Sequence, residues 1–173
     1  EPTVAAVRAL GGVRAIAISH PHYYSSMVEW SRAFDAPIYL HADDQQNIMR
    51  PDPAIELWQG ETRELWEGLT LIRCGGHFAG GQVAHWAAGA GGAGVLLTGD
   101  IIQVVQDRRY VSFMYSYPNL IPLPARAVRR IVAAVEPYAF ARIYGAWWDK
   151  IIPEDAKGAV ARSAARYIAA IGG

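Results

Sequence analysis

The sequence predicts a layered α/β fold, and three observations carry that prediction. Residues Val13–Ser19 and Pro37–His41 are apolar and β-prone, and they flank a segment, Ser26–Phe34, whose apolar residues repeat at helical spacing. Such a strand, helix, strand order is typical of a right-handed crossover. Short β-prone runs separated by turn residues follow, and the 173 residues, 52% hydrophobic and 18% charged, suffice for one compact core.

The later elements follow from local signals. We expect antiparallel strands at Ile55–Trp58, Thr62–Trp66 and Thr70–Arg73, and two strands, Gln82–Ala87 and Val95–Thr98, joined by a glycine-rich loop. A helix is predicted at Pro124–Val135, a strand at Ala141–Tyr144, and a last helix from about Pro153 to Gly172. No repeat or linker divides the chain, so residues 1–173 are predicted to form a single domain.

Composition narrows the function classes. Sixteen Lys and Arg residues balance sixteen Asp and Glu residues without blocks of like charge, so the sequence predicts neither nucleic acid nor a membrane surface as partner. Its apolar runs fall short of the roughly 20 residues of a membrane span. The single cysteine cannot form an internal disulfide, and this favours a cytoplasmic location.

Histidines and one aspartate gather at predicted strand ends and in a glycine turn. The run Ile16–Ser19 delivers His20 and His22 at alternate positions, which point the same way in an extended chain. His77 stands between glycines in the turn at 75–81, and Asp100 ends the predicted strand at 95–98. Three imidazoles and one carboxylate are a ligand set for zinc or iron.

These segments resemble the metallo-β-lactamase-fold hydrolases. The run His20-Pro21-His22 is similar to the opening of the family's H-x-H-x-D-H motif, the turn around His77 to its third-histidine turn, and Leu97-Thr98-Gly99-Asp100 to its strand ending in Gly-Asp. The resemblance covers about residues 13–148 and implies an αββα sandwich. It also implies that His20, His22, His77 and Asp100 hold one zinc ion, with iron or manganese as alternatives.

The departures concern the second metal of that family. Tyr24 and Ser25 stand where the resemblance places an aspartate and a histidine, and Ala146 stands where it places the late histidine. We expect a single metal ion with an open position, which is a geometry of catalytic zinc. Asp100 would complete the ligand set or act as a base, and Tyr24 would donate a hydrogen bond to a substrate oxygen. Alternatively, the segment 23–26 begins a helix, with Ser25 or Ser26 as N-cap and Glu29 placed to form a capping box with Ser26.

Other reactive residues are interpreted as structural. His41 is expected to be a surface histidine at a strand end, His85 to bond to backbone or to support a ligand, and Cys74 to be a small buried side chain and not a metal thiolate. The aromatic and proline-rich segment Asp107–Pro124 fits either a substrate pocket or a strand packed on a helix.

Strands that precede the first histidine motif in the family have no counterpart here. The sequence therefore predicts an N-terminally incomplete sandwich, completed either by self-association or by an additional N-terminal segment. The predicted function is a metal-dependent hydrolase in which one ion activates water against an ester, thioester or amide, with a small molecule as substrate. The alternative is a catalytically inactive relative that binds a partner or has a structural role.

Overall fold

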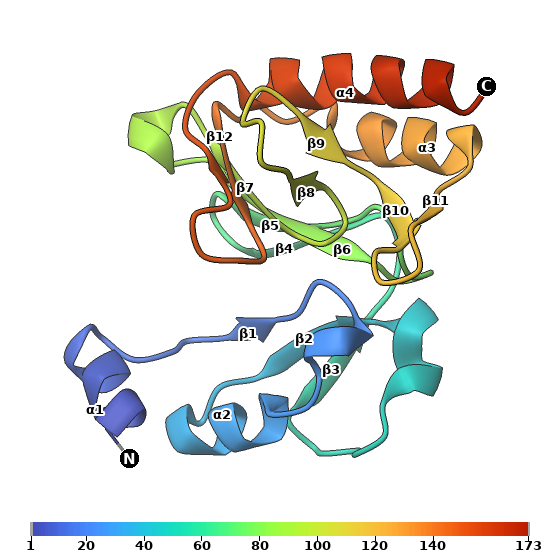
Figure 1. Ribbon diagram of the computed structural model, residues 1–173. Coiled ribbons are helices and arrows are strands. Elements are labelled where there is room, and N and C mark those ends of the chain that lie inside the picture. Colours follow the sequence, from blue (N-terminus) through green and yellow to red (C-terminus); the bar gives the residue numbers. More distant parts are fainter. Residues whose placement is uncertain (1, 173) are drawn as a thin grey trace.

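The computed structural model describes residues 2–172, and these form four layers (Figure 1). Two helices cover one face of a six-stranded sheet, a three-stranded sheet faces its other side, and a third helix covers that smaller sheet. The helices are α1 (Pro2–Ala9), α2 (Met27–Phe34), α3 (Ala125–Val135) and α4 (Ala156–Ala170). None of the helices within residues 2–172 combines the length and apolarity needed to cross a membrane.

The larger sheet has the strand order β13-β12-β7-β6-β5-β4. Its strands are β4 (Thr62–Trp66), β5 (Leu69–Arg73), β6 (Gln82–Trp86), β7 (Val95–Gly99), β12 (Arg142–Gly145) and β13 (Ile151–Ile152). Only β7 and β12 are parallel. One face is sealed because side chains of its strands, such as Leu96 and Ile143, pack against Ile131 of α3 and Val160 of α4, all at most 2% exposed.

The smaller sheet is parallel and has the order β1-β2-β3. Its strands are β1 (Ile16–Ala17), β2 (Ile38–His41) and β3 (Ile55–Trp58). Helix α2 packs on it through Met27 and Val28, which contact the fully buried Ile38 and Leu40. The predicted strand, helix, strand order is confirmed, although the first strand is only two residues long.

Two short hairpins and three 3₁₀ turns complete the fold. The hairpins pair β8 (Gln103–Val104) with β9 (Val111–Ser112) and β10 (Met114–Ser116) with β11 (Ile121–Pro122), and the turns are η1 (Pro21–Tyr23), η2 (Ala42–Asn47) and η3 (Ala90–Gly92).

The pairing predicted for Ile55–Trp58 is wrong. This strand runs parallel to β2 and not antiparallel to β4, because the turn at residues 59–61 carries the chain from the smaller sheet to the larger one. The predicted capping box is also wrong: Ser26 is the N-cap residue of α2 but makes no side-chain cap bond, and Glu29 pairs with Arg50 instead. Helix α1 and strand β13 had no predicted counterpart.

The space between the two sheets is only partly filled. A hollow of about 340 Å³ lies there, with Ile18 on one side and Leu71, Ala84 and Leu97 on the other, and Leu97 is 43% exposed. Among the described strands, β1 pairs only with β2. That a second copy of the chain covers this region stays a prediction.

Candidate metal centre

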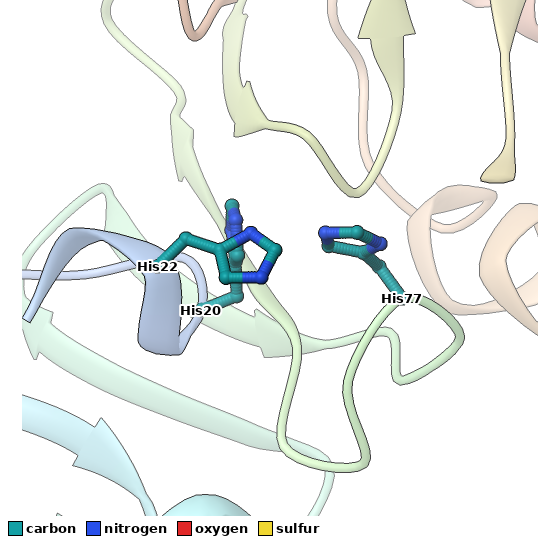
Figure 2. A group of neighbouring side chains, drawn as sticks. All are labelled: His20, His22 and His77. Carbon is teal, nitrogen blue, oxygen red and sulfur yellow. The ribbon is translucent and has the colours of Figure 1, made fainter. Parts of the chain in front are cut away.

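Three histidines from two separate segments meet above the sheet edges (Figure 2). One ligand atom from each of His20, His22 and His77 lies within 4.8 Å of the others. The rings also contact one another edge to face, with centroids 4.8 to 5.3 Å apart. The structure thus brings together the three histidines on which the sequence prediction rests.

A 3₁₀ turn, and not an extended strand, brings His20 and His22 together. His20 follows β1 in an extended conformation and serves as N-cap of η1, and His22 lies inside that turn. The sequence analysis therefore predicted the correct pair of histidines, but it assumed an extended strand where the structure has a 3₁₀ turn. His20 is fully buried and His22 is exposed, so the centre opens to solvent on the His22 side.

Neighbouring groups orient His20 and His77. The Nδ1 atom of His20 lies 2.9 Å from Ser19 Oγ, and the Nδ1 atom of His77 lies 3.1 Å from the carbonyl oxygen of Met114. In both rings, Nε2 is the nitrogen left to face the centre. Gly99 makes the first contact feasible, since its φ is 53° and a Cβ there would collide with Ser19 Oγ.

A buried carboxylate holds the loop that carries His77. Asp44 is 1% exposed, and its Oδ1 accepts a hydrogen bond of 2.9 Å from the backbone N–H of Gly80. A Cβ at Gly80 would lie 2.9 Å from the same carboxylate, so only glycine permits this close approach.

Asp100 lies beside the three histidines. Its Oδ2 lies 3.7 Å from His20 Nε2 and accepts a 3.3 Å hydrogen bond from the hydroxyl of Tyr23. Its backbone carbonyl accepts a hydrogen bond of 2.9 Å from the hydroxyl of Tyr117. Asp100 is 7% exposed, so it is buried directly beside the histidines.

Unpartnered atoms test whether this set fits a cation. Four buried side-chain nitrogen or oxygen atoms lack a hydrogen-bond partner among the described residues, and three of them are His20 Nε2, His77 Nε2 and Asp100 Oδ1. Leaving a buried polar atom unpaired costs about 1–3 kcal/mol. Two imidazole nitrogens and a carboxylate oxygen that share this condition at one place are donors that fit a divalent transition metal.

The protonation states also fit a metal ligand set. Burial lowers the pKa of His20 to about 3, with smaller contributions from His77 and His22. Burial also lowers the pKa of His77, against the opposing hydrogen bond to Met114. Both rings are therefore neutral near pH 7, which is the form that binds metal.

Tyr23, and not Tyr24, faces the centre. The Tyr23 ring stands edge to face on His20, with centroids 4.8 Å apart, and burial followed by the charge of Asp100 raises its pKa to about 12. Tyr24 packs against the core beneath the smaller sheet, where burial and the charge of Asp44 raise its pKa. Tyr24 is thus not placed for the predicted hydrogen bond to a substrate oxygen, and the tyrosine that faces the centre is Tyr23, whose hydroxyl donates to Asp100.

The other reactive residues have structural environments. The prediction that His41 is a surface residue is wrong, because its side chain is only 3% exposed. Its Nε2 bonds to the Gly60 carbonyl at 3.0 Å, and its Nδ1 accepts a hydrogen bond from the Asp43 N–H. The Nε2 of His85 bonds to the Ala139 carbonyl at 2.7 Å, as predicted. Cys74 lies in the main core, and burial raises the pKa of its thiol to about 12.

The aromatic segment 107–124 packs on a helix, as one of its two predicted roles requires, and its lining of a substrate pocket stays a prediction. Phe113 is fully buried and contacts Tyr167 of α4, with ring centroids 5.8 Å apart. Tyr117 lies beside His77, at a centroid distance of 5.5 Å. Phe78, which sequence analysis did not single out, contacts all three histidine rings.

Comparison with known sequences gives one curated relative, and no family model matches the chain. The uncharacterized protein YmaE of Bacillus subtilis (strain 168) is 55% identical over 171 residues, which cover 99% of this chain. The chain spans 62% of the length of that relative.

Several solved structures share the fold. TTHA1623 in a di-iron-bound form superimposes with a TM-score of 0.64 at 20% identity, over 94% of this chain and 83% of that one. A B3 metallo-β-lactamase with an active-site glutamic acid gives 0.61 at 13% identity, over 98% and 76%. An N-acyl homoserine lactone hydrolase, with its product N-hexanoyl-L-homoserine at the catalytic metal centre, gives 0.54 at 20% identity, over 78% and 57%. The chain therefore has the metallo-β-lactamase fold, as the sequence predicted, and within it a group of histidines that could bind metal.

Proposed function

We propose that this protein is a metal-dependent hydrolase that uses one divalent ion held by His20, His22, His77 and Asp100. The observation that carries the proposal is the set of buried, unpartnered donor atoms on His20, His77 and Asp100. Zinc is the first choice, with iron and manganese as alternatives, because imidazole and carboxylate ligands suit all three. The fold neighbours with a di-iron centre and with a product at a catalytic metal centre support this assignment.

The expected reaction is hydrolysis of an ester, thioester or amide. The oxygen of a water molecule bonds to the acyl carbon, the bond from that carbon to oxygen, sulfur or nitrogen breaks, and the leaving group departs with a proton from the water. A bound divalent ion supplies Lewis-acid activation of water near neutral pH.

The chain's own residues would position the reactants. Asp100 Oδ1, which has no hydrogen-bond partner among the described residues, would either complete the ligand set or accept a proton of the attacking water. Tyr23 keeps its proton near pH 7 and orients Asp100 through Oδ2. The exposed edge at His22 gives the substrate access.

A second candidate function is a binding or structural role without catalysis. It is favoured by Tyr24, Ser25 and Ala146, which stand where the family resemblance places ligands of a second metal. Tyr24 in particular is turned into the core of the smaller sheet.

Metal analysis and a hydrolysis screen on His77→Ala and His85→Ala separate the two functions. We expect about one zinc or iron per chain in the wild type and in His85→Ala, and loss of both metal and ester or thioester hydrolysis in His77→Ala. His85 is the matched control because it is a buried histidine bonded to backbone. Hydrolysis that survives His77→Ala unchanged would contradict the proposal, and metal-free wild-type protein after zinc addition would favour the binding role.

A further inference from the structure

A chain of aromatic rings runs from the buried histidines to the surface. The Tyr23 ring contacts His20 and, at a centroid distance of 6.3 Å, the indole of Trp147. Trp147 lies in the loop between β12 and β13 and is 56% exposed. Its neighbour Trp148 is 97% exposed, and the loop encloses a hollow of about 620 Å³. The exposed indoles of Trp147 and Trp148 thus form an apolar surface, and only the ring of Tyr23 separates Trp147 from His20 of the candidate metal centre.

The histidines are also lined by aromatic side chains. Phe78 contacts His20, His22 and His77 at centroid distances of 5.0 to 5.6 Å, and Tyr117 lies beside His77. Aromatic walls with a few convergent polar atoms are typical of sites for apolar ligands.

Cationic side chains do not take part in this lining. The hydrogen bonds and ring contacts of His20, His77, Tyr23 and Tyr117 are with other aromatic rings, Ser19, Asp100 and backbone carbonyls, and within the described residues none of these contacts is with a lysine or arginine. Recognition of phosphate or carboxylate commonly uses Arg or Lys. The site therefore offers an anionic substrate no protein counter-charge.

Two cations at the loop of Trp147 are already engaged in hydrogen bonds. Lys150, in the same loop, bonds to the side chain of Gln106 at 2.8 Å. Arg108 donates to the backbone carbonyls of Val105 and Asp149, so it holds the loop in place.

We propose that Trp147 and Tyr23 form an acyl subsite, and that the substrate is an uncharged ester or thioester with an apolar acyl chain. The acyl chain of the substrate would lie on the Trp147 indole. The carbonyl group of the same substrate would then reach the space between Asp100 and the histidines. This inference rests on the proposed hydrolase function for the reaction, but the binding surface is independent of it. Burial of each methylene against the indole favours the longer chain.

Binding is tested first, without catalysis. Octanamide, an uncharged apolar amide, is titrated calorimetrically into metal-free protein, with acetamide as the short-chain comparison. We expect octanamide to bind and Trp147→Ala to weaken its binding about tenfold, whereas Trp147→Phe weakens it less. Trp86→Ala is the matched control, because Trp86 is 48% exposed on β6 and, within residues 2–172, makes no ring contact with His20, His22 or His77. Equal octanamide binding by the wild type and Trp147→Ala would overturn the subsite.

Turnover is tested next with the zinc-loaded protein. The value of kcat/KM should rise at least about tenfold from p-nitrophenyl acetate to p-nitrophenyl octanoate, and Trp147→Ala should flatten this dependence. Faster hydrolysis of the anion bis(p-nitrophenyl) phosphate, or esterase activity without dependence on chain length, would refute the substrate class. If no ester is hydrolysed while octanamide still binds through Trp147, the hydrolase function fails and the subsite stands.

Discussion

Two groups of buried histidines in this molecule differ in what their ring nitrogens contact. His20, His77, His41 and His85 are 0%, 4%, 3% and 7% exposed, so burial alone does not separate them. Backbone groups partner both nitrogens of His41 and the Nε2 of His85. Among the described residues, His20 and His77 each keep one nitrogen without a hydrogen-bond partner; both belong to the group with His22, and that of His20 lies 3.7 Å from Asp100 Oδ2. The comparison teaches that an unpaired nitrogen, and not a hidden ring, marks a candidate ligand.

The largest expected effect comes from substituting one histidine of each group and comparing how zinc changes the Tm of the two variants. Zinc in hundredfold excess over its Kd stabilises a folded protein by about 2.7 kcal/mol, which for this length raises Tm by about 5–10 °C. We expect His20→Ala to abolish this zinc-dependent rise. His41→Ala should lower the free energy of unfolding by about 2–3 kcal/mol, because the Gly60 carbonyl loses its partner and Trp58 its edge-to-face contact, and should keep the rise.

Differential scanning calorimetry with and without zinc measures both responses. The readout is the shift that zinc causes in each variant and not the absolute Tm, so a general loss of stability in His20→Ala does not imitate the result. A zinc-dependent rise in His20→Ala equal to that of the wild type would remove the distinction between the two groups.

The sequence predicted the trio because each histidine lies in a segment with a local signal and the order of these segments resembles that of a known family. Gly75 and Gly76 have positive φ in the turn around His77, Gly80 leaves no room for a side chain, and the strand before Asp100 is a recognisable apolar run. His41 was misjudged because its partner, the carbonyl of Gly60, is 19 residues away and is fixed only when the two sheets meet. The pairing of β3 depended in the same way on a contact that is distant in sequence, and local pattern could not specify it.

Which of Tyr23 and Tyr24 faces the histidines could be decided only from the structure of the turn at residues 21–23. Residues 21–23 form a 3₁₀ turn, in which successive side chains point about 120° apart, whereas the sequence argument selected Tyr24 by its position in the motif that this segment resembles. Tyr23 consequently faces Asp100 and Tyr24 faces the core of the smaller sheet.

The different orientations of Tyr23 and Tyr24 predict an effect on kcat that is smaller than the loss of zinc binding in His20→Ala. Tyr23→Phe removes one hydrogen bond to Asp100 and keeps the ring on His20, so kcat for an ester should fall about tenfold with KM little changed. Tyr24→Phe should leave kcat within about twofold, because no contact of Tyr24 with the histidines or Asp100 is recorded in residues 2–172. Steady-state kinetics of both variants measure these changes in kcat. An equal loss of kcat in Tyr23→Phe and Tyr24→Phe would contradict a specific role for the Tyr23 hydroxyl.

Asp44 connects the two groups of histidines and predicts the smallest effect. It bonds to Gly80 in the loop of His77, and its neighbours include His41, Asp43 and Arg73. Burial raises its pKa above the usual value of 3.8, against the opposing effects of the Gly80 N–H, His41 and Arg73. The folded state therefore binds more protons than the unfolded state just above pH 3.8, so the contribution of Asp44 to stability falls as pH rises through that window.

Asp44→Asn keeps an oxygen that accepts the Gly80 N–H and removes the charge. We expect the variant to gain, relative to the wild type, up to about 1 kcal/mol in free energy of unfolding near pH 7, and this gain should shrink toward pH 4. Urea unfolding of the metal-free proteins between pH 4 and pH 7 measures the difference. A gain that grows on acidification would mean that the carboxylate is stabilised by its neighbours, and the loop of His77 would then depend on the charge of Asp44 and not on its hydrogen bond alone.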